Sequence, residues 1–167
     1  MNIHPLIVHF PVALLFIYSI LEIARFKLIK NIAQIFYIKA SFVIIGAVMS
    51  YAAFITGNIA KGLVPSSGIN NILLSHERFA KLTIFIFSVA AIGYLIRWTL
   101  EISFEKIPQN FRNFLTSISN VILSPFVSVA LALMGLITLS ITGILGGTMV
   151  YGPTTDPFAG FLYPFFK

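Results

Sequence analysis

Residues 121–145 read VILSPFVSVALALMGLITLSITGIL and carry no charged side chain. At about 1.5 Å per residue, a helix over this stretch is longer than the ~30 Å hydrocarbon core of a bilayer. Three further, mainly apolar runs cover about residues 5–24, 35–56 and 72–100. Proline and glycine inside such runs are tolerated, because neighbouring helices satisfy the freed backbone groups. The pattern predicts four transmembrane helices.

The composition of the chain agrees with this pattern. Hydrophobic residues make up 58% of the 167 residues, charged residues make up 10%, and the mean hydropathy is +0.97. A soluble domain needs far more polar surface than that. We therefore expect an all-α integral membrane protein, a single four-helix up-and-down bundle over residues 1–167. Because the chain has no cysteine, it forms no disulfide, thiolate metal site or covalent c-type haem attachment.

The cations predict the orientation in the membrane. Seven Lys and Arg residues flank the first and third connections between the runs, and four flank the second connection or end the chain. The positive-inside rule then places both termini and residues 58–75 outside. Cations at helix ends suit lipid headgroups, and no basic stripe points to nucleic acid. The seven are Arg25, Lys27, Lys30, Lys39, Arg97, Lys106 and Arg112, and the four are Lys61, Arg78, Lys81 and Lys167.

The segments between and after the runs are expected to be simple. The connections are short apart from residues 58–75, where Asn70 or Asn71 could cap an early start of the third helix. The tail, residues 151–167, contains three prolines and four phenylalanines. Proline interrupts helices and aromatic rings favour the headgroup level, so the tail is predicted to lie on the outer interface without forming a long helix.

All three histidines are predicted to lie at one face of the membrane. His4 precedes the first helix, His9 lies inside it, and His76 lies at the start of the third. The second and fourth helices end at the same surface, with Thr56-Gly57 and with the sequence GGTMVYG at residues 146–152. Most of the polar and small residues therefore gather in one layer, the predicted functional layer.

His9 is the most informative of the three. It lies among apolar residues about one turn into the first helix, where an ionisable group normally faces the bundle interior. Pro11 leaves a backbone carbonyl without its usual donor close by. His76 reaches the same depth if the third helix begins near Asn71, whereas a start at Ser75 makes His4 the better match. The simpler interpretations are a carbonyl-bonded imidazole for His9 and helix-start roles for His4 and His76.

Two neutral imidazoles at one depth on two helices are what bis-histidine haem b ligation requires. His9 and His76 are the preferred axial ligands, each with an alanine four residues later on the same face. Glycines on the second and fourth helices could form slot walls, and two outer cations could meet haem propionates, although packing and snorkelling explain such residues equally well. The alanines are Ala13 and Ala80, the glycines Gly46, Gly57, Gly143 and Gly146, and the cations Arg78 and Lys81.

Other chemistries have less support in the sequence. A zinc or copper site could combine the three histidines with Glu77 or Asp156. No paired membrane carboxylates suggest proton pumping, because Glu22 lies near the inner end beside Arg25. There is no hydrolase signature, and with little chain outside the bilayer an independent enzyme is not expected.

The chain resembles a family of small bacterial membrane proteins, domain of unknown function 2231. The resemblance spans nearly the whole chain and is carried by HPLIVHFP at residues 4–11, Thr56-Gly57, His76-Glu77 and GGTMVYG at residues 146–152. It implies a four-helix protein of the bacterial cytoplasmic membrane, some relatives of which occur beside or fused to redox modules. It implies no catalytic residues.

The sequence thus favours a haem b electron-transfer subunit of a larger redox complex, with its histidine layer towards the periplasm. Electrons would pass between a quinol or membrane partner and an external acceptor such as a c-type cytochrome. The alternatives are a cofactor-free accessory subunit of a membrane complex and a non-haem metal site.

Overall fold

The computed structural model describes residues 3–24, 32, 34–63, 71–102, 108–152 and 157–166. In these ranges the chain is almost entirely helical, as expected for a backbone that must satisfy its own hydrogen bonds in lipid. The helices are α1 (His4–Ala24), α3 (Ile35–Gly62), α4 (Asn71–Ile102), α5 (Gln109–Ile122), α6 (Pro125–Tyr151) and α7 (Pro157–Phe166).

Four of these helices are long and apolar enough to cross a bilayer. They are α1, α3, α4 and α6, with 21, 28, 32 and 27 residues and a mean hydropathy of 1.9 to 2.2 over their most apolar windows. The predicted all-α membrane bundle with four spans is therefore confirmed. The third span begins at Asn71, so the early start considered from the sequence is also confirmed.

The fourth predicted span was misplaced. The structure divides residues 109–151 into α5 and α6, which are separated at Leu123 and Ser124. Pro125 has no backbone N–H to donate, so it stands at the first helical position of α6 instead of inside a longer helix. The span therefore runs from Pro125 to Tyr151, and the expectation of a short third connection is wrong.

The other boundaries also differ from the prediction. α3 continues to Gly62, six residues past the predicted end, which shortens the connection that follows it. In the tail, Pro157–Phe166 forms the ten-residue helix α7 even though Pro164 lies inside it. A proline near the end of a short helix removes few backbone hydrogen bonds, so a helix of this length remains possible. Residues 153–156 and Lys167 lie outside the described residues.

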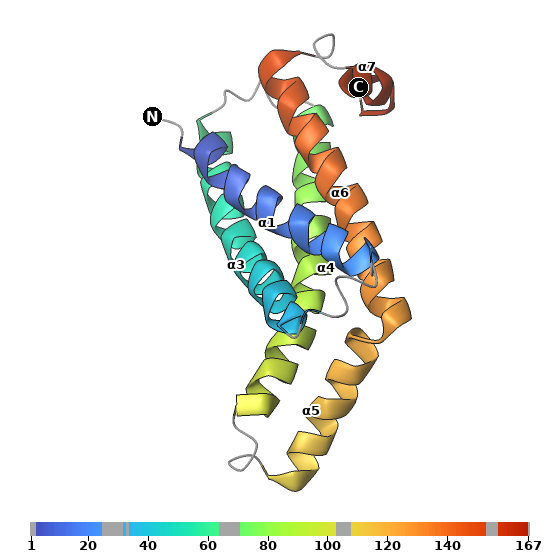
Figure 1. The fold of residues 1–167 in the computed structure, drawn as a ribbon. Helices are drawn as coiled ribbons and strands as arrows, with labels where there is room; N and C mark the ends of the chain where they lie inside the picture. The colour runs from blue at the N-terminus through green and yellow to red at the C-terminus, as the bar shows by residue number, and fades with distance from the viewer. Residues whose placement is uncertain are drawn as a thin grey trace.

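The four spans form a bundle in which α1 and α4 are diagonal to each other. α1 packs on α3 and α6, and α4 packs on the same two helices. Both ends of the chain lie at one end of the bundle (Figure 1), as up-and-down connectivity requires. At the opposite end, the last turns of α4 and the whole of α5 form a helical hairpin that projects beyond α1 and α3 (Figure 1).

The core is narrow and combines small residues with a few large rings. Alanines let the helix backbones approach closely, which is the usual packing mode of membrane helices. Large apolar side chains cover the outside of the bundle instead, as lipid contact allows. The buried core consists of Leu15, Tyr18, Ala40, Val43, Ala47, Phe87, Ala90, Ala91, Tyr94, Ala132 and Leu139.

Candidate functional site

His4 and His76 lie together at the end of the bundle that holds both chain termini. His4 is the first residue of α1 and His76 lies in the second turn of α4. The first turn of α1 and the second turn of α4 lie at the same end of the bundle (Figure 1), although α1 and α4 are diagonal to each other. We refer to His4 and His76, with the residues that contact their rings, as the two-histidine site.

The ring of His4 is held by α3. Its Nδ1 lies 3.1 Å from Thr56 Oγ1, and that hydroxyl donates its single proton to the carbonyl oxygen of Ala53 at 3.0 Å. With the hydroxyl proton used in this way, Thr56 Oγ1 accepts from His4 Nδ1, and the carbonyl oxygen of Ala53 is a further hydrogen-bond partner of the His4 ring. A neutral imidazole that carries its proton on Nδ1 has its lone pair on Nε2.

The ring of His76 is held in the same way by α6. Its Nδ1 lies 2.9 Å from the carbonyl oxygen of Thr142, which can only accept. His76 therefore also carries its proton on Nδ1 and its lone pair on Nε2. In metal-binding proteins, a ligating imidazole commonly donates its other N–H to a carbonyl or a side-chain oxygen, which fixes the tautomer and the ring direction. Both histidines of the site have this arrangement.

Each ring also lies against a glycine. A Cβ added to Gly57 would lie 3.1 Å from His4 Cε1, and a Cβ added to Gly146 would lie 3.3 Å from His76 Cε1. Glycine at these two positions lets the backbones of α3 and α6 approach the imidazole edges. Gly57 and Gly146 therefore lie directly against the two histidine rings.

His9 does not join the site. Its side chain is exposed on the outside of α1, and its Nδ1 lies 2.5 Å from the carbonyl oxygen of Pro5, one turn back. At 3.6 residues per turn, a separation of five residues places His4 and His9 about 140° apart around the helix. The prediction that His9 faces the bundle interior opposite His76 is therefore wrong. The carbonyl-bonded imidazole considered as the simpler interpretation is what the structure has.

The other predicted site residues divide into two groups. Ala13 is exposed on the outer side of α1, Gly143 is exposed on α6, and Gly46 lies against Leu15 in the core. These three take no part in the two-histidine site. Ala80 is half-buried one turn after His76.

The charged residues of this end form their own network. Glu77 bridges Lys61, at 2.5 Å, and Lys81, at 2.6 Å, so it links the end of α3 to the start of α4. Lys81 also lies over the ring of Phe54. Arg78 is exposed beside this network. Of the two cations predicted to meet haem propionates, Lys81 is thus engaged by Glu77, and Arg78 lies about 200° around α4 from His76.

A site with several protein ligands finds no support in the described ranges. They contain no group of three or more His, Asp or Glu residues placed to hold a metal ion, and the chain has no cysteine. His9 points away from the other two histidines, and Glu77 is paired with lysines. Asp156, the other carboxylate considered for zinc, lies outside the described residues.

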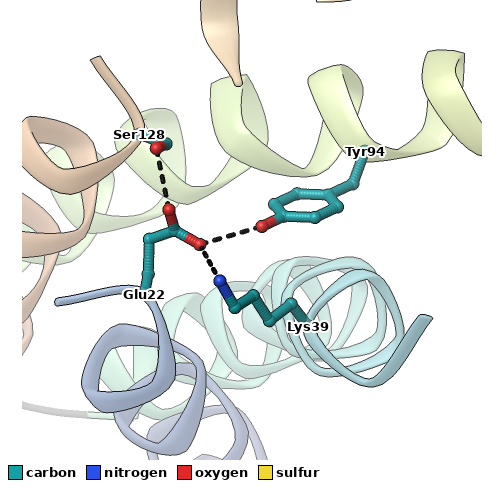
Figure 2. Close-up of polar contacts among 4 residues, drawn as sticks. All are labelled: Glu22, Lys39, Tyr94 and Ser128. Carbon is teal, nitrogen blue, oxygen red and sulfur yellow. Dashed lines mark hydrogen bonds and ion pairs between the residues drawn. The ribbon is translucent and has the colours of Figure 1, made fainter. Parts of the chain in front are cut away.

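A second polar cluster lies near the other end of the bundle and was missed from the sequence. Glu22 on α1 is only 2% exposed and contacts all three other spans, as Figure 2 shows. Its Oε2 accepts from Lys39 Nζ of α3 and from Tyr94 OH of α4, both at 2.9 Å, and its Oε1 accepts from Ser128 Oγ of α6 at 2.7 Å.

The sequence did contain the signal for this cluster. Glu22 and Lys39 each lie within an apolar run, and an ionisable residue inside a membrane helix normally has a partner in the bundle. We assigned Glu22 to the inner end beside Arg25 and counted Lys39 among the orienting cations. The structure instead pairs these two residues across α1 and α3, with Lys39 only 14% exposed.

Comparison with known proteins identifies the family alone. No curated protein and no solved structure matches the chain. A family model described as "Predicted membrane protein (DUF2231)" matches residues 1–155, which include the histidines, both glycines of the site and the Glu22 cluster. The chain therefore belongs to the DUF2231 family of predicted membrane proteins.

Proposed function

We propose that the protein is a membrane-embedded electron-transfer subunit that binds one haem b between His4 and His76. The observation that carries the proposal is the matched state of the two rings. Each Nδ1 lies within hydrogen-bond distance of an oxygen, Thr56 Oγ1 for His4 and the Thr142 carbonyl oxygen for His76, and the tautomer with its proton on Nδ1 has the Nε2 lone pair that an axial ligand requires.

The helix arrangement also suits such a cofactor. Axial nitrogens must approach the iron from opposite sides, and α1 and α4 are diagonal in the bundle. The flanking helices α3 and α6 contribute Gly57 and Gly146, which keep the walls beside the two rings free of side chains. Haem bound here would supply a reversible one-electron couple inside the bilayer, close to one membrane surface.

The partners follow from where the site lies. A cofactor near the surface exchanges electrons with a quinol or membrane subunit on one side and with an external acceptor, such as a c-type cytochrome, on the other. If the positive-inside rule holds for this chain, the two-histidine site faces the periplasm of a bacterial cytoplasmic membrane. The protein would then act as one subunit of a larger redox complex.

A cofactor-free accessory subunit is the second candidate function. It is favoured by the hairpin of α4 and α5, which projects past the bundle and exposes Phe111, Phe114 and Val121 by more than half of each side chain. Exposed apolar residues beyond the spans are typical of a surface that contacts another subunit. A subunit that binds haem could also use this hairpin to contact another subunit.

The test is the absorption spectrum of the purified protein and of three single variants. The parent should show a Soret band with low-spin features. His4→Ala and His76→Ala should each lose the low-spin spectrum, because each removes one axial nitrogen. His9→Ala is the matched control on the same helix and should keep the parent spectrum. Loss of the spectrum in His9→Ala with retention in His4→Ala would overturn the pairing, and parent protein that binds no haem even when haem is added would leave the accessory role.

A further inference from the structure

We infer that Glu22 fixes the rotation of α1 about its own axis and thereby positions His4 in the two-histidine site. The effect on haem rests on the proposed function, whereas the rotation of α1 does not. Glu22 is thus a positioning residue, five helical turns away from the imidazole that it directs.

The apolar side chains of α1 do not by themselves select an inward face. Leu15 is buried in the core, but Phe10, Phe16 and Ile17 are equally apolar and lie exposed on the outside. In lipid, turning one of these side chains outward and another inward changes little in hydrophobic burial, because the surroundings are apolar on both sides. Rotation must therefore be selected by packing shape and by the polar residues of the helix.

Glu22 supplies that selection. In the observed rotation, its carboxylate accepts hydrogen bonds from one side chain on each of the other three spans: Lys39, Tyr94 and Ser128. A turn of α1 by one residue position, about 100°, would carry the carboxylate away from all three donors and towards lipid. An unpartnered carboxylate there is far more costly than an exposed apolar side chain. Buried polar groups select register in coiled coils by the same means.

The position of His4 follows from helix geometry. His4 precedes Glu22 by 18 residues, which is about five complete turns, so the two side chains leave α1 on the same side. His9 precedes Glu22 by 13 residues, about 3.6 turns, and so points to the opposite side. The structure has this relation: Glu22 is buried and His4 contacts Thr56 of α3, while His9 is exposed. Any rotation that frees Glu22 therefore removes His4 from its partners.

A disulfide reports this rotation without any cofactor. Leu15 Cγ lies 2.8 Å from the place of a Cβ built on Gly46 of α3. Replacing both residues with cysteine removes the leucine that would clash and leaves the two Cβ atoms within the ~3.5–4.5 Å that a disulfide spans. The natural chain has no cysteine, so no other thiol interferes. Leu15→Cys with Val48→Cys, which faces outward from α3, is the control pair.

The experiment compares the rate of oxidative cross-linking in purified protein. The Leu15–Gly46 cysteine pair should cross-link readily, and the Val48 control pair should not. Glu22→Leu should slow the reaction by about fivefold or more, because it removes the carboxylate that selects the rotation. Glu101→Leu removes an exposed glutamate from α4 and should have no effect. The exchanged pair Glu22→Lys with Lys39→Glu should restore cross-linking, since the ion pair is re-formed in the opposite sense.

Each result decides the matter. An unchanged cross-linking rate in helical, monodisperse Glu22→Leu protein would overturn the inference, since Glu22 would then contribute stability only. If Glu22→Leu does not fold, the exchanged pair decides: cross-linking at the parent rate supports the inference, and slow cross-linking in folded protein overturns it. The protein could bind no haem and still cross-link more slowly when Glu22 is replaced. That result would refute the proposed function and leave the positioning role of Glu22 in place.

Discussion

At the scale of single residues, the tautomer of each histidine in the site follows from the oxygen that its Nδ1 contacts. Thr56 Oγ1 and the Thr142 carbonyl oxygen each accept the Nδ1 proton of a ring, so both Nε2 atoms are held as lone-pair donors. Outer partners of this kind commonly change metal affinity or activity by about 10–100-fold when they are removed. The glycines act differently, since they leave room for the rings.

The glycine beside His76 gives a direct prediction. Gly146→Ala places a methyl group 3.3 Å from His76 Cε1, so the ring must move by a few tenths of an ångström, and we expect its bond to Thr142 to weaken. Haem affinity, measured by titrating haem-free protein, should fall by about tenfold. Gly147→Ala is the matched control, because a Cβ there meets nothing within 4 Å. Equal affinities in the two variants would remove Gly146 from the site.

His9 shows what limited the prediction of the site from the sequence. The histidines lie near one end of the bundle, but a position along the bundle axis does not state which way a side chain points. The direction was available from Glu22 and Ser19, the buried polar residues of α1. His4 lies on the side that continues from Glu22, through Tyr18, and His9 does not. The buried polar residues of α1 therefore decide which of the two histidines, His4 or His9, faces the bundle interior.

At the scale of elements, the spans were predictable and their ends were not. Long apolar runs identify a membrane helix regardless of detail, and four such helices are present. The missed element is α5, whose apolar residues recur every three or four positions between polar ones. The sequence-based prediction joins its last residues to the next span because it treats Pro125 as an interior proline. The backbone begins a new helix there, since proline suits the first helical turn.

The contact between α5 and α4 gives a prediction at this scale. A Cβ on Gly93 of α4 would lie 2.5 Å from Ile122 Cγ2 and 3.0 Å from Ile122 Cβ, so Gly93→Ala must displace the end of α5. Overpacking of this kind usually costs about 1–3 kcal/mol. The thermal midpoint in detergent should fall relative to the parent. Gly143→Ala, where nothing lies within 4 Å of the added Cβ, should leave the midpoint unchanged or raised, and an equal fall in both would refute the contact.

At the scale of the whole molecule, the bundle separates its polar groups into two layers. One end holds the two-histidine site and the Glu77 network, and the other holds the Glu22 cluster that joins all four spans. Between them lie mainly apolar core residues, and the hydroxyls of Ser50 and Thr138 donate to carbonyl oxygens of their own helices. The layer with the two-histidine site suits the proposed exchange of electrons with partners. The layer with the Glu22 cluster holds the four helices in one arrangement.

The orientation of these layers is a prediction for intact cells. Single cysteines at Leu63, which is 74% exposed at the end of α3, and at Asn110 of α5 lie at opposite ends of the bundle. An impermeant thiol reagent should label the Leu63→Cys protein from outside and the Asn110→Cys protein only after lysis. The reason is the excess of cations at the α5 end. The reverse labelling would place the two-histidine site at the cytoplasmic face.

The most direct test of the central claim is a titration of haem into the purified, haem-free protein. If His4 and His76 are the axial ligands, the Soret band should shift to a six-coordinate low-spin form and saturate at one haem per chain. The variant that combines His4→Ala with His76→Ala should not produce that form, and His9→Ala should produce it as the parent does. A parent spectrum that never becomes low-spin, or a low-spin spectrum that survives in the double variant, would contradict the account.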